Sequence, residues 1–108
     1  MIRVLKLFIV LGLLAAAFAS ARAGAFNHVQ DTPGVYYTNV NVPSAANCQQ
    51  FGAAYGNYWH FITNNGPLGS YTRNPGNPLS VSGAIAAGNY YIFQEVYGSG
   101  YSGTVITW

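Results

Sequence analysis

The chain has 108 residues, and its first 23 have the composition of a secretion leader, which leaves 108 − 23 = 85 residues for one small domain over 24–108. That domain carries Arg73 against Asp31 and Glu95, a formal charge of 1 − 2 = −1. A domain with one basic residue lacks the phosphate-neutralising side chains that nucleic-acid binding requires. It also lacks the polybasic segment that holds a protein on a membrane surface.

Residues 1–23 predict a signal peptide. Arg3 and Lys6 form a basic start, and residues 7–19 form an apolar run too short to span a bilayer. Small residues then offer cleavage after Ala21 or after Ala23. We therefore expect a secreted protein, periplasmic or extracellular. No second hydrophobic stretch follows, so we expect no transmembrane anchoring once the leader is removed.

The first half of the domain predicts one strand and one helix. Residues 24–32 read as an irregular lead-in, and Pro33-Gly34 marks a turn. Residues 35–42 alternate between apolar and polar side chains, as a half-buried strand does. The segment 44–55 then has a serine suited to a helix start and an apolar stripe at helical spacing, so we expect a short helix there.

The second half predicts only strands. Turn-forming Gly, Asn and Pro residues separate five segments that are rich in aromatic and β-branched residues. These segments are 58–63, 68–72, 79–85, 90–97 and 104–108. With 35–42 they make about six strands, so the sequence predicts an all-β domain. We expect a small antiparallel sandwich or barrel with one short helix near 44–55.

Cys48 is the only cysteine, so an internal disulfide is impossible. Three interpretations remain: a buried thiol, an intermolecular disulfide, or a reactive nucleophile. The predicted helix places Cys48 on its apolar stripe, which favours the buried thiol.

Enzymatic chemistry finds little support in the residues. The run Gly98 to Gly103 matches a dinucleotide-binding glycine pattern, but the residues after it predict a strand instead of the helix that must receive the phosphates. Asp31 and Glu95 are the only carboxylates of the domain, and one Cys with two His residues cannot frame a metal site alone. We predict no enzyme, no cofactor and no metal.

Aromatic residues are the strongest functional signal. Residues 24–108 contain nine Tyr, four Phe and two Trp, more than a small core needs. Exposed Tyr and Trp residues are enriched at recognition sites because they provide contact area at low entropic cost. Candidate binding residues near turns or on polar strand faces are Tyr37, Trp59, His60, Tyr71, Tyr97 and Tyr101.

We therefore expect a secreted, non-enzymatic binding protein whose aromatic surface contacts an extracellular glycan or protein. Two alternatives stay open. One is a self-assembling matrix or fibre subunit, because residues 90–94 have high β-propensity and little charge. The other is a small secreted antibacterial or toxin-like protein.

Overall fold

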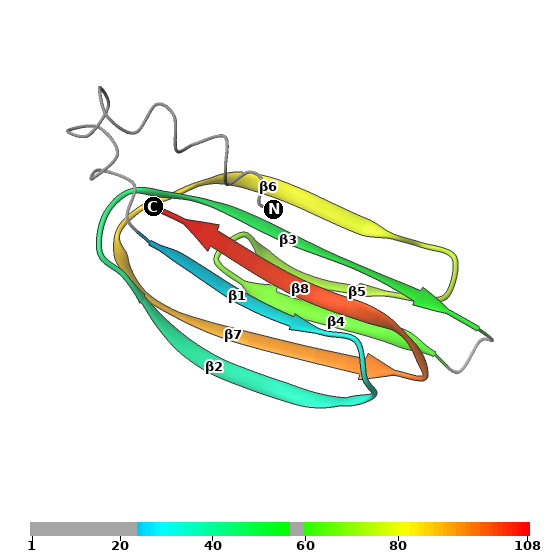
Figure 1. Cartoon of the computed structure of the whole chain (residues 1–108). Helices are drawn as coiled ribbons and strands as arrows, with labels where there is room; N and C mark the ends of the chain where they lie inside the picture. The colour runs from blue at the N-terminus through cyan, green and yellow to red at the C-terminus, as the bar shows by residue number, and fades with distance from the viewer. Residues whose placement is uncertain (1–23, 57–59) are drawn as a thin grey trace, which may run out of the picture.

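The computed structural model describes residues 24–56 and 60–108. The predicted signal peptide over 1–23 and Trp59 lie outside the described residues. Eight strands occupy the described part (Figure 1). Their bounds are β1 (Ala25–Gln30), β2 (Gly34–Val42), β3 (Ala46–Tyr55), β4 (Phe61–Gly66), β5 (Gly69–Arg73), β6 (Leu79–Ile85), β7 (Gly88–Tyr97) and β8 (Ser99–Thr107).

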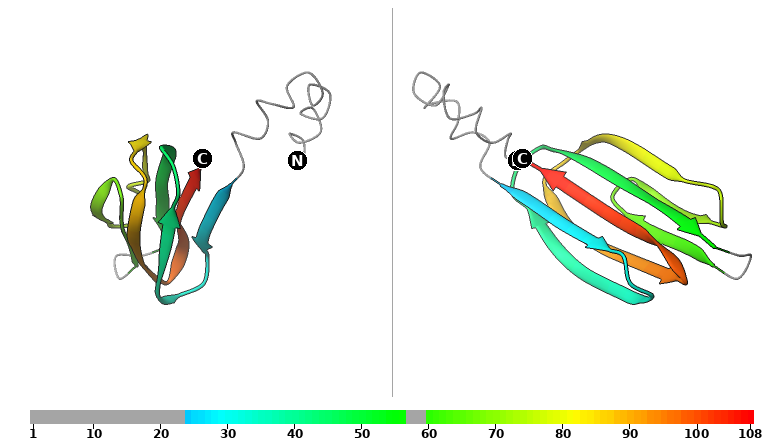
Figure 2. Two further views of the ribbon diagram at one scale, coloured as in Figure 1. Left: turned by 90° about the vertical axis from the view of Figure 1, so that its left-hand side faces the viewer. Right: turned by 45° about the vertical axis from the view of Figure 1, so that its right-hand side comes forward.

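The strands form two four-stranded antiparallel sheets that face one another (Figures 1 and 2). Sheet A has the order β1-β8-β3-β6, and sheet B has the order β2-β7-β4-β5. The first strand pairs with the eighth, the second with the seventh, the third with the sixth and the fourth with the fifth. The chain is thus one long hairpin that is rolled into a sandwich, which is the jelly-roll arrangement. The all-β sandwich is confirmed.

The helix expected near 44–55 is wrong, because this segment forms strand β3. Its apolar residues fit a helical stripe, but the residues at every second position also face the core. Gln50 occupies one of these inward positions. Because Gln50 is polar, the alternation of apolar and polar residues that predicts a strand is incomplete in this segment. The lead-in before the first turn is also a strand, β1, so the described part has eight strands instead of about six.

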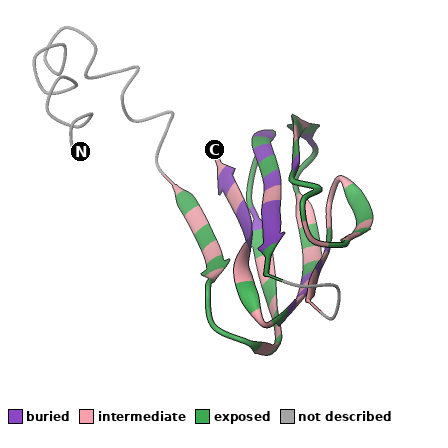
Figure 3. Ribbon diagram, turned by 90° about the vertical axis from the view of Figure 1, so that its right-hand side faces the viewer, coloured by how far each residue is buried: buried purple, intermediate pink, exposed green. Residues whose placement is uncertain are grey.

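The core lies between the sheets, as the alternating burial along the strands shows (Figure 3). Buried apolar residues form two clusters. One contains Val42, Ala46, Cys48, Ile85 and Ile106. The other contains Ala54, Ile62, Leu79 and Val96.

Five polar side chains are fully buried in the sandwich, and we call them the polar belt: Gln50, Asn64, Gln94, Ser102 and Thr104. Asn64 of β4 uses both ends of its amide. Its Nδ2 donates to the carbonyl of Gly103 at 2.7 Å, and its Oδ1 accepts from Gln50 Nε2 and Thr104 Oγ1, each at 3.2 Å. Sheet B is thereby hydrogen-bonded to two strands of sheet A.

Gln50 of β3 also holds the turn between β4 and β5. Its Oε1 accepts from the Leu68 backbone N–H at 2.6 Å, and its Nε2 donates to the Gly69 carbonyl at 3.2 Å. Buried amides with satisfied partners fix one alignment of the elements they join. The belt therefore sets how the two sheets sit on each other.

Three tyrosines of sheet B donate their hydroxyls to backbone carbonyls a few residues upstream. Tyr36 bonds Thr32 at 2.7 Å, Tyr71 bonds Leu68 at 3.0 Å and Tyr90 bonds Ala86 at 2.7 Å. Part of the tyrosine content therefore serves to fasten the ends of strands.

Replacing Asn64 by Ala should lower the free energy of unfolding by about 3 kcal/mol or more, because a buried carbonyl, hydroxyl and amide lose a partner together. Asn65→Ala, at the exposed neighbouring position, should change it by about 0.5 kcal/mol or less. Urea unfolding of both variants measures the difference. Equal losses would show that the belt does not hold the sheets.

His28 of β1 faces the core, where its Nδ1 and Gln94 Oε1 are buried without a hydrogen-bond partner among the described residues. Burial lowers the pKa of His28, and the nearby Gln94 amide partly opposes that shift. The folded state therefore favours the neutral imidazole.

Stability should consequently fall as pH drops below about 6.5, where His28 takes up a proton in the unfolded chain before it does so in the folded one. His28→Gln should flatten the stability profile between about pH 7 and pH 5. Chemical denaturation across this range measures both proteins. An unchanged slope in the variant would assign the dependence to another group.

Candidate binding face

The outward surface of sheet B carries five aromatic side chains, and we call it the aromatic face: Tyr37, Phe61, Tyr91, Phe93 and Tyr97. Three of them come from β7, where residues at every second position point outward because Ile92 and Val96 between them are fully buried. Tyr37 is 66% exposed and Tyr91 51% exposed. Neighbouring exposed rings form an apolar patch, and such patches are candidates for contact surfaces.

The sheet register brings these rings together in pairs. Tyr37 stacks on Tyr91 with ring centroids 6.3 Å apart, and Phe61 stacks on Tyr97 at 4.2 Å. Phe93 lies between the pairs and is directly opposite Tyr37 in the register. Successive outward residues of a strand lie about 7 Å apart, so the rings form a row along β7.

Amide and hydroxyl side chains surround the row. In the register Asn39 faces Tyr91 and Asn65 faces Phe93. Glu95 is the one charged residue among the outward positions of sheet B. It accepts a hydrogen bond of 2.9 Å from the Tyr97 hydroxyl. This bond raises the pKa of Tyr97, so the phenol stays protonated and neutral. The face is therefore aromatic, polar and almost uncharged.

A shallow hollow of about 480 Å³ ends the aromatic face near the β7–β8 turn. Its lining includes Pro33, Val35, His60 and Tyr97. The imidazole of His60 is placed by two glycines with positive φ, Gly56 at 102° and Gly98 at 75°. A Cβ on either would fall within 2.2 Å of the ring, so no other residue fits there.

The hydrogen bonds of His60 indicate which ring nitrogen can accept a hydrogen bond from a ligand. Nδ1 lies 2.7 Å from the Tyr55 carbonyl oxygen, which can only accept, and 3.5 Å from the Ser99 backbone nitrogen, which can only donate. The much shorter contact to Tyr55 favours the tautomer in which Nδ1 carries the proton. In the neutral ring Nε2 is then an acceptor. The hollow thus combines apolar walls with an imidazole, a group that can hydrogen-bond a hydroxyl.

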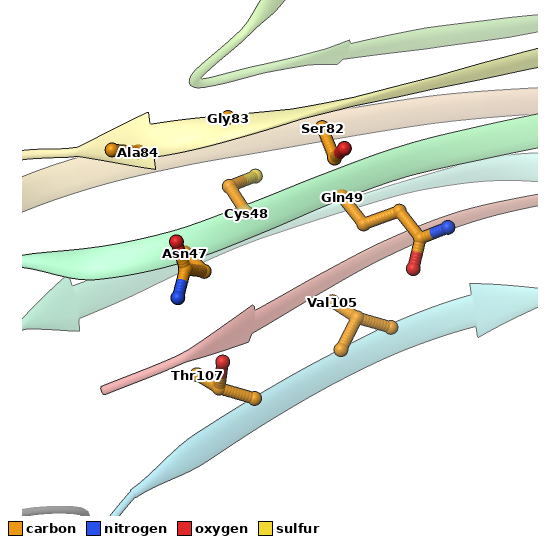
Figure 4. A pocket seen from close by; sticks show the side chains of 8 residues that line it. All are labelled: Asn47, Cys48, Gln49, Ser82, Gly83, Ala84, Val105 and Thr107. Atoms are coloured by element: carbon orange, nitrogen blue, oxygen red, sulfur yellow. The ribbon is translucent and has the colours of Figure 1, made fainter.

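A second hollow, of about 400 Å³, lies on sheet A (Figure 4). It is lined by Asn47, Cys48 and Gln49 of β3, Ser82, Gly83 and Ala84 of β6, and Val105 and Thr107 of β8. In Figure 4 the side chains of Cys48 and Gln49 point to opposite sides of β3. The hollow has polar and small side chains but no aromatic ring, so it offers less contact area than the aromatic face.

Five of the six residues predicted to bind lie in the described part of the chain, and these five do not form one site. Tyr37 and Tyr97 lie on the aromatic face, and His60 lines the hollow at its end. Tyr71 faces the core. Tyr101 lies on the outer surface of sheet A, beside Phe51 and Tyr55.

Sequence reasoning missed Phe61, Tyr91 and Phe93. The alternation along residues 90–97 does place Tyr91, Phe93 and Tyr97 on one side of the strand. Both sides are aromatic or aliphatic, however, so the pattern did not show which side faces solvent.

Cys48 belongs to the first apolar cluster and is 2% exposed. Burial raises the pKa of its thiol to about 11, which disfavours the reactive thiolate. A disulfide to a second chain would require this residue to leave the core.

Cys48 should react with a thiol reagent in denaturant but only slowly in the native protein, because the reagent reaches sulfur only when the core opens. Mass spectrometry of samples labelled for increasing times measures this. Complete labelling of the native protein as fast as that of the unfolded chain would show an accessible thiol.

Within the described residues no helix is long and apolar enough to cross a membrane. No protein-family model and no curated protein matches the chain.

Proposed function

We propose that this chain is a secreted, non-enzymatic binding protein whose aromatic face binds an uncharged glycan chain. The main support for this proposal is the row of stacked, exposed rings on sheet B, together with the amide and hydroxyl side chains beside it. Secretion is supported by the basic start and apolar run of the first 23 residues. The fold itself does not favour a function.

A sugar ring has an apolar C–H surface and a rim of hydroxyl groups. The C–H surface packs on an aromatic ring, and each hydroxyl both donates and accepts a hydrogen bond. Side-chain amides such as those of Asn39 and Asn65 also do both. Rings repeated along β7 suit a linear polymer, which offers the same contact at successive units.

The scarcity of charge favours a neutral glycan as the partner. Protein interfaces are enriched in arginine as well as aromatic residues, and the outward positions of β2, β4, β5 and β7 hold no arginine or lysine. A neutral glycan needs no electrostatic steering. The hollow beside His60 fits one further ring, whose hydroxyl can donate to Nε2.

Replacing Tyr37 and Tyr91 together by Ala should weaken binding to a neutral polysaccharide by about tenfold or more, because two exposed platforms are removed. Affinity electrophoresis in gels containing soluble neutral polysaccharides measures the binding of each variant. Far-ultraviolet circular dichroism checks the fold.

The matched control is Tyr55→Ala with Tyr101→Ala, which removes two tyrosines from the outer surface of sheet A. It should bind as the unchanged protein does. Equal loss in both double variants would contradict the assignment of the face. Failure of every polysaccharide, with a protein partner captured through Tyr37 and Tyr91, would replace the glycan by a protein.

A further inference from the structure

Strand β2 is an unprotected sheet edge. It is paired on one side only, with β7, and it lies at the outer edge of sheet B (Figure 1). It runs for nine residues without a proline or a charged side chain. Natural sheet edges are normally blunted by short length, charge or proline, because a free row of backbone groups pairs with another strand.

The other edge of sheet B is protected. Strand β5 has five residues and ends at Arg73. Strand β2, in contrast, carries two of the most exposed large apolar side chains of the described residues, Tyr37 at 66% and Val35 at 53%. Of the two edges of sheet B, only β2 combines length, lack of charge and exposed apolar area.

We propose that two copies of this chain associate through β2, edge to edge and antiparallel, in a closed twofold dimer. Pairing along the whole strand places Gly34 of one copy opposite Val42 of the other. Thr38 then faces Thr38 on the axis, and Tyr37 faces Asn39. The two sheets B become one eight-stranded sheet with a continuous outer surface.

The same register extends the aromatic face. Residues diagonal to one another across paired strands lie about 7–8 Å apart, within reach of aromatic side chains. The two Tyr37 residues are diagonal neighbours at the axis. Each already stacks on Tyr91 of its own copy, so the dimer has a row of four tyrosines across the junction.

Charge also favours a second copy as the occupant. Glu95 lies opposite Val35 in the register, near one end of β2. Antiparallel pairing sends the two Glu95 residues to opposite ends of the interface, so no like charges meet. Because an isologous contact uses the same surface on both copies, association stops at two.

Sedimentation equilibrium over a range of protein concentrations tests the dimer. Asn39→Lys puts a lysine from each copy beside the axis and should raise the dimer dissociation constant by about fivefold or more. Asn65→Lys adds the same charge to the same outer surface, but on β4, where both sides of the strand are paired. It should leave the dissociation constant unchanged.

Cysteine cross-linking tests the register in a Cys48→Ala background. A mixture of Tyr37→Cys and Asn39→Cys chains should form a disulfide readily, because directly opposite residues approach closely enough. Tyr37→Cys alone should cross-link less. A reversed order would overturn the proposed register.

A monomer at every concentration, or an equal effect of both lysine variants, would overturn the dimer. Species that grow with time would also overturn it and would indicate open assembly instead. The proposal does not depend on glycan binding. A chain that forms the dimer but binds no polysaccharide would overturn the proposed function alone, and a chain that binds polysaccharide as a monomer would overturn the dimer alone.

Discussion

The sandwich depends on the amide of Asn64, which hydrogen-bonds strand β4 of sheet B to strands β3 and β8 of sheet A. An apolar interior alone tolerates sliding of one sheet over the other, since contacts between aliphatic groups are not directional. A buried amide does not tolerate it, because each displaced donor or acceptor loses its partner in a site without water. Gln50 extends the same constraint to the β4–β5 turn. The polar belt thus restricts an otherwise non-directional apolar contact to a single alignment of the two sheets.

That alignment also determines which rings reach solvent. With Ile92, Gln94 and Val96 directed inward, β7 must direct Tyr91, Phe93 and Tyr97 outward. A slip of one residue would exchange the two sets. The contact surface of sheet B is therefore a consequence of burying amides on its other side, and the two surfaces of the strand cannot be changed independently.

Sequence patterns anticipated the strands whose alternation is complete. Residues 35–42, 79–85 and 90–97 each correspond to a strand of the structure. The strand β3 was missed because Gln50 breaks the apolar alternation. The role of Gln50 becomes visible only in the folded structure, where its side chain bonds Asn64 of the other sheet. On the aromatic face, Tyr37 could be predicted as outward-facing because the other residues on its side of the strand are polar. Tyr91 could not, because Tyr90 beside it is equally aromatic and only the second sheet decides which ring is covered.

The pairing of first strand with last bears on how the chain reaches this state. Among the hydrogen-bonded strand pairs of the described part, only β4 and β5 are neighbours along the chain, whereas the pairing of β1 with β8 joins residues about eighty positions apart. Gly24 and Trp108 complete that pairing with two backbone hydrogen bonds. Contacts this distant in sequence make folding slow. We expect order to spread outward from the β4–β5 hairpin, so that β8 stays an open edge until β1 arrives. A newly synthesised chain would pass through that stage with its central strands exposed to other copies.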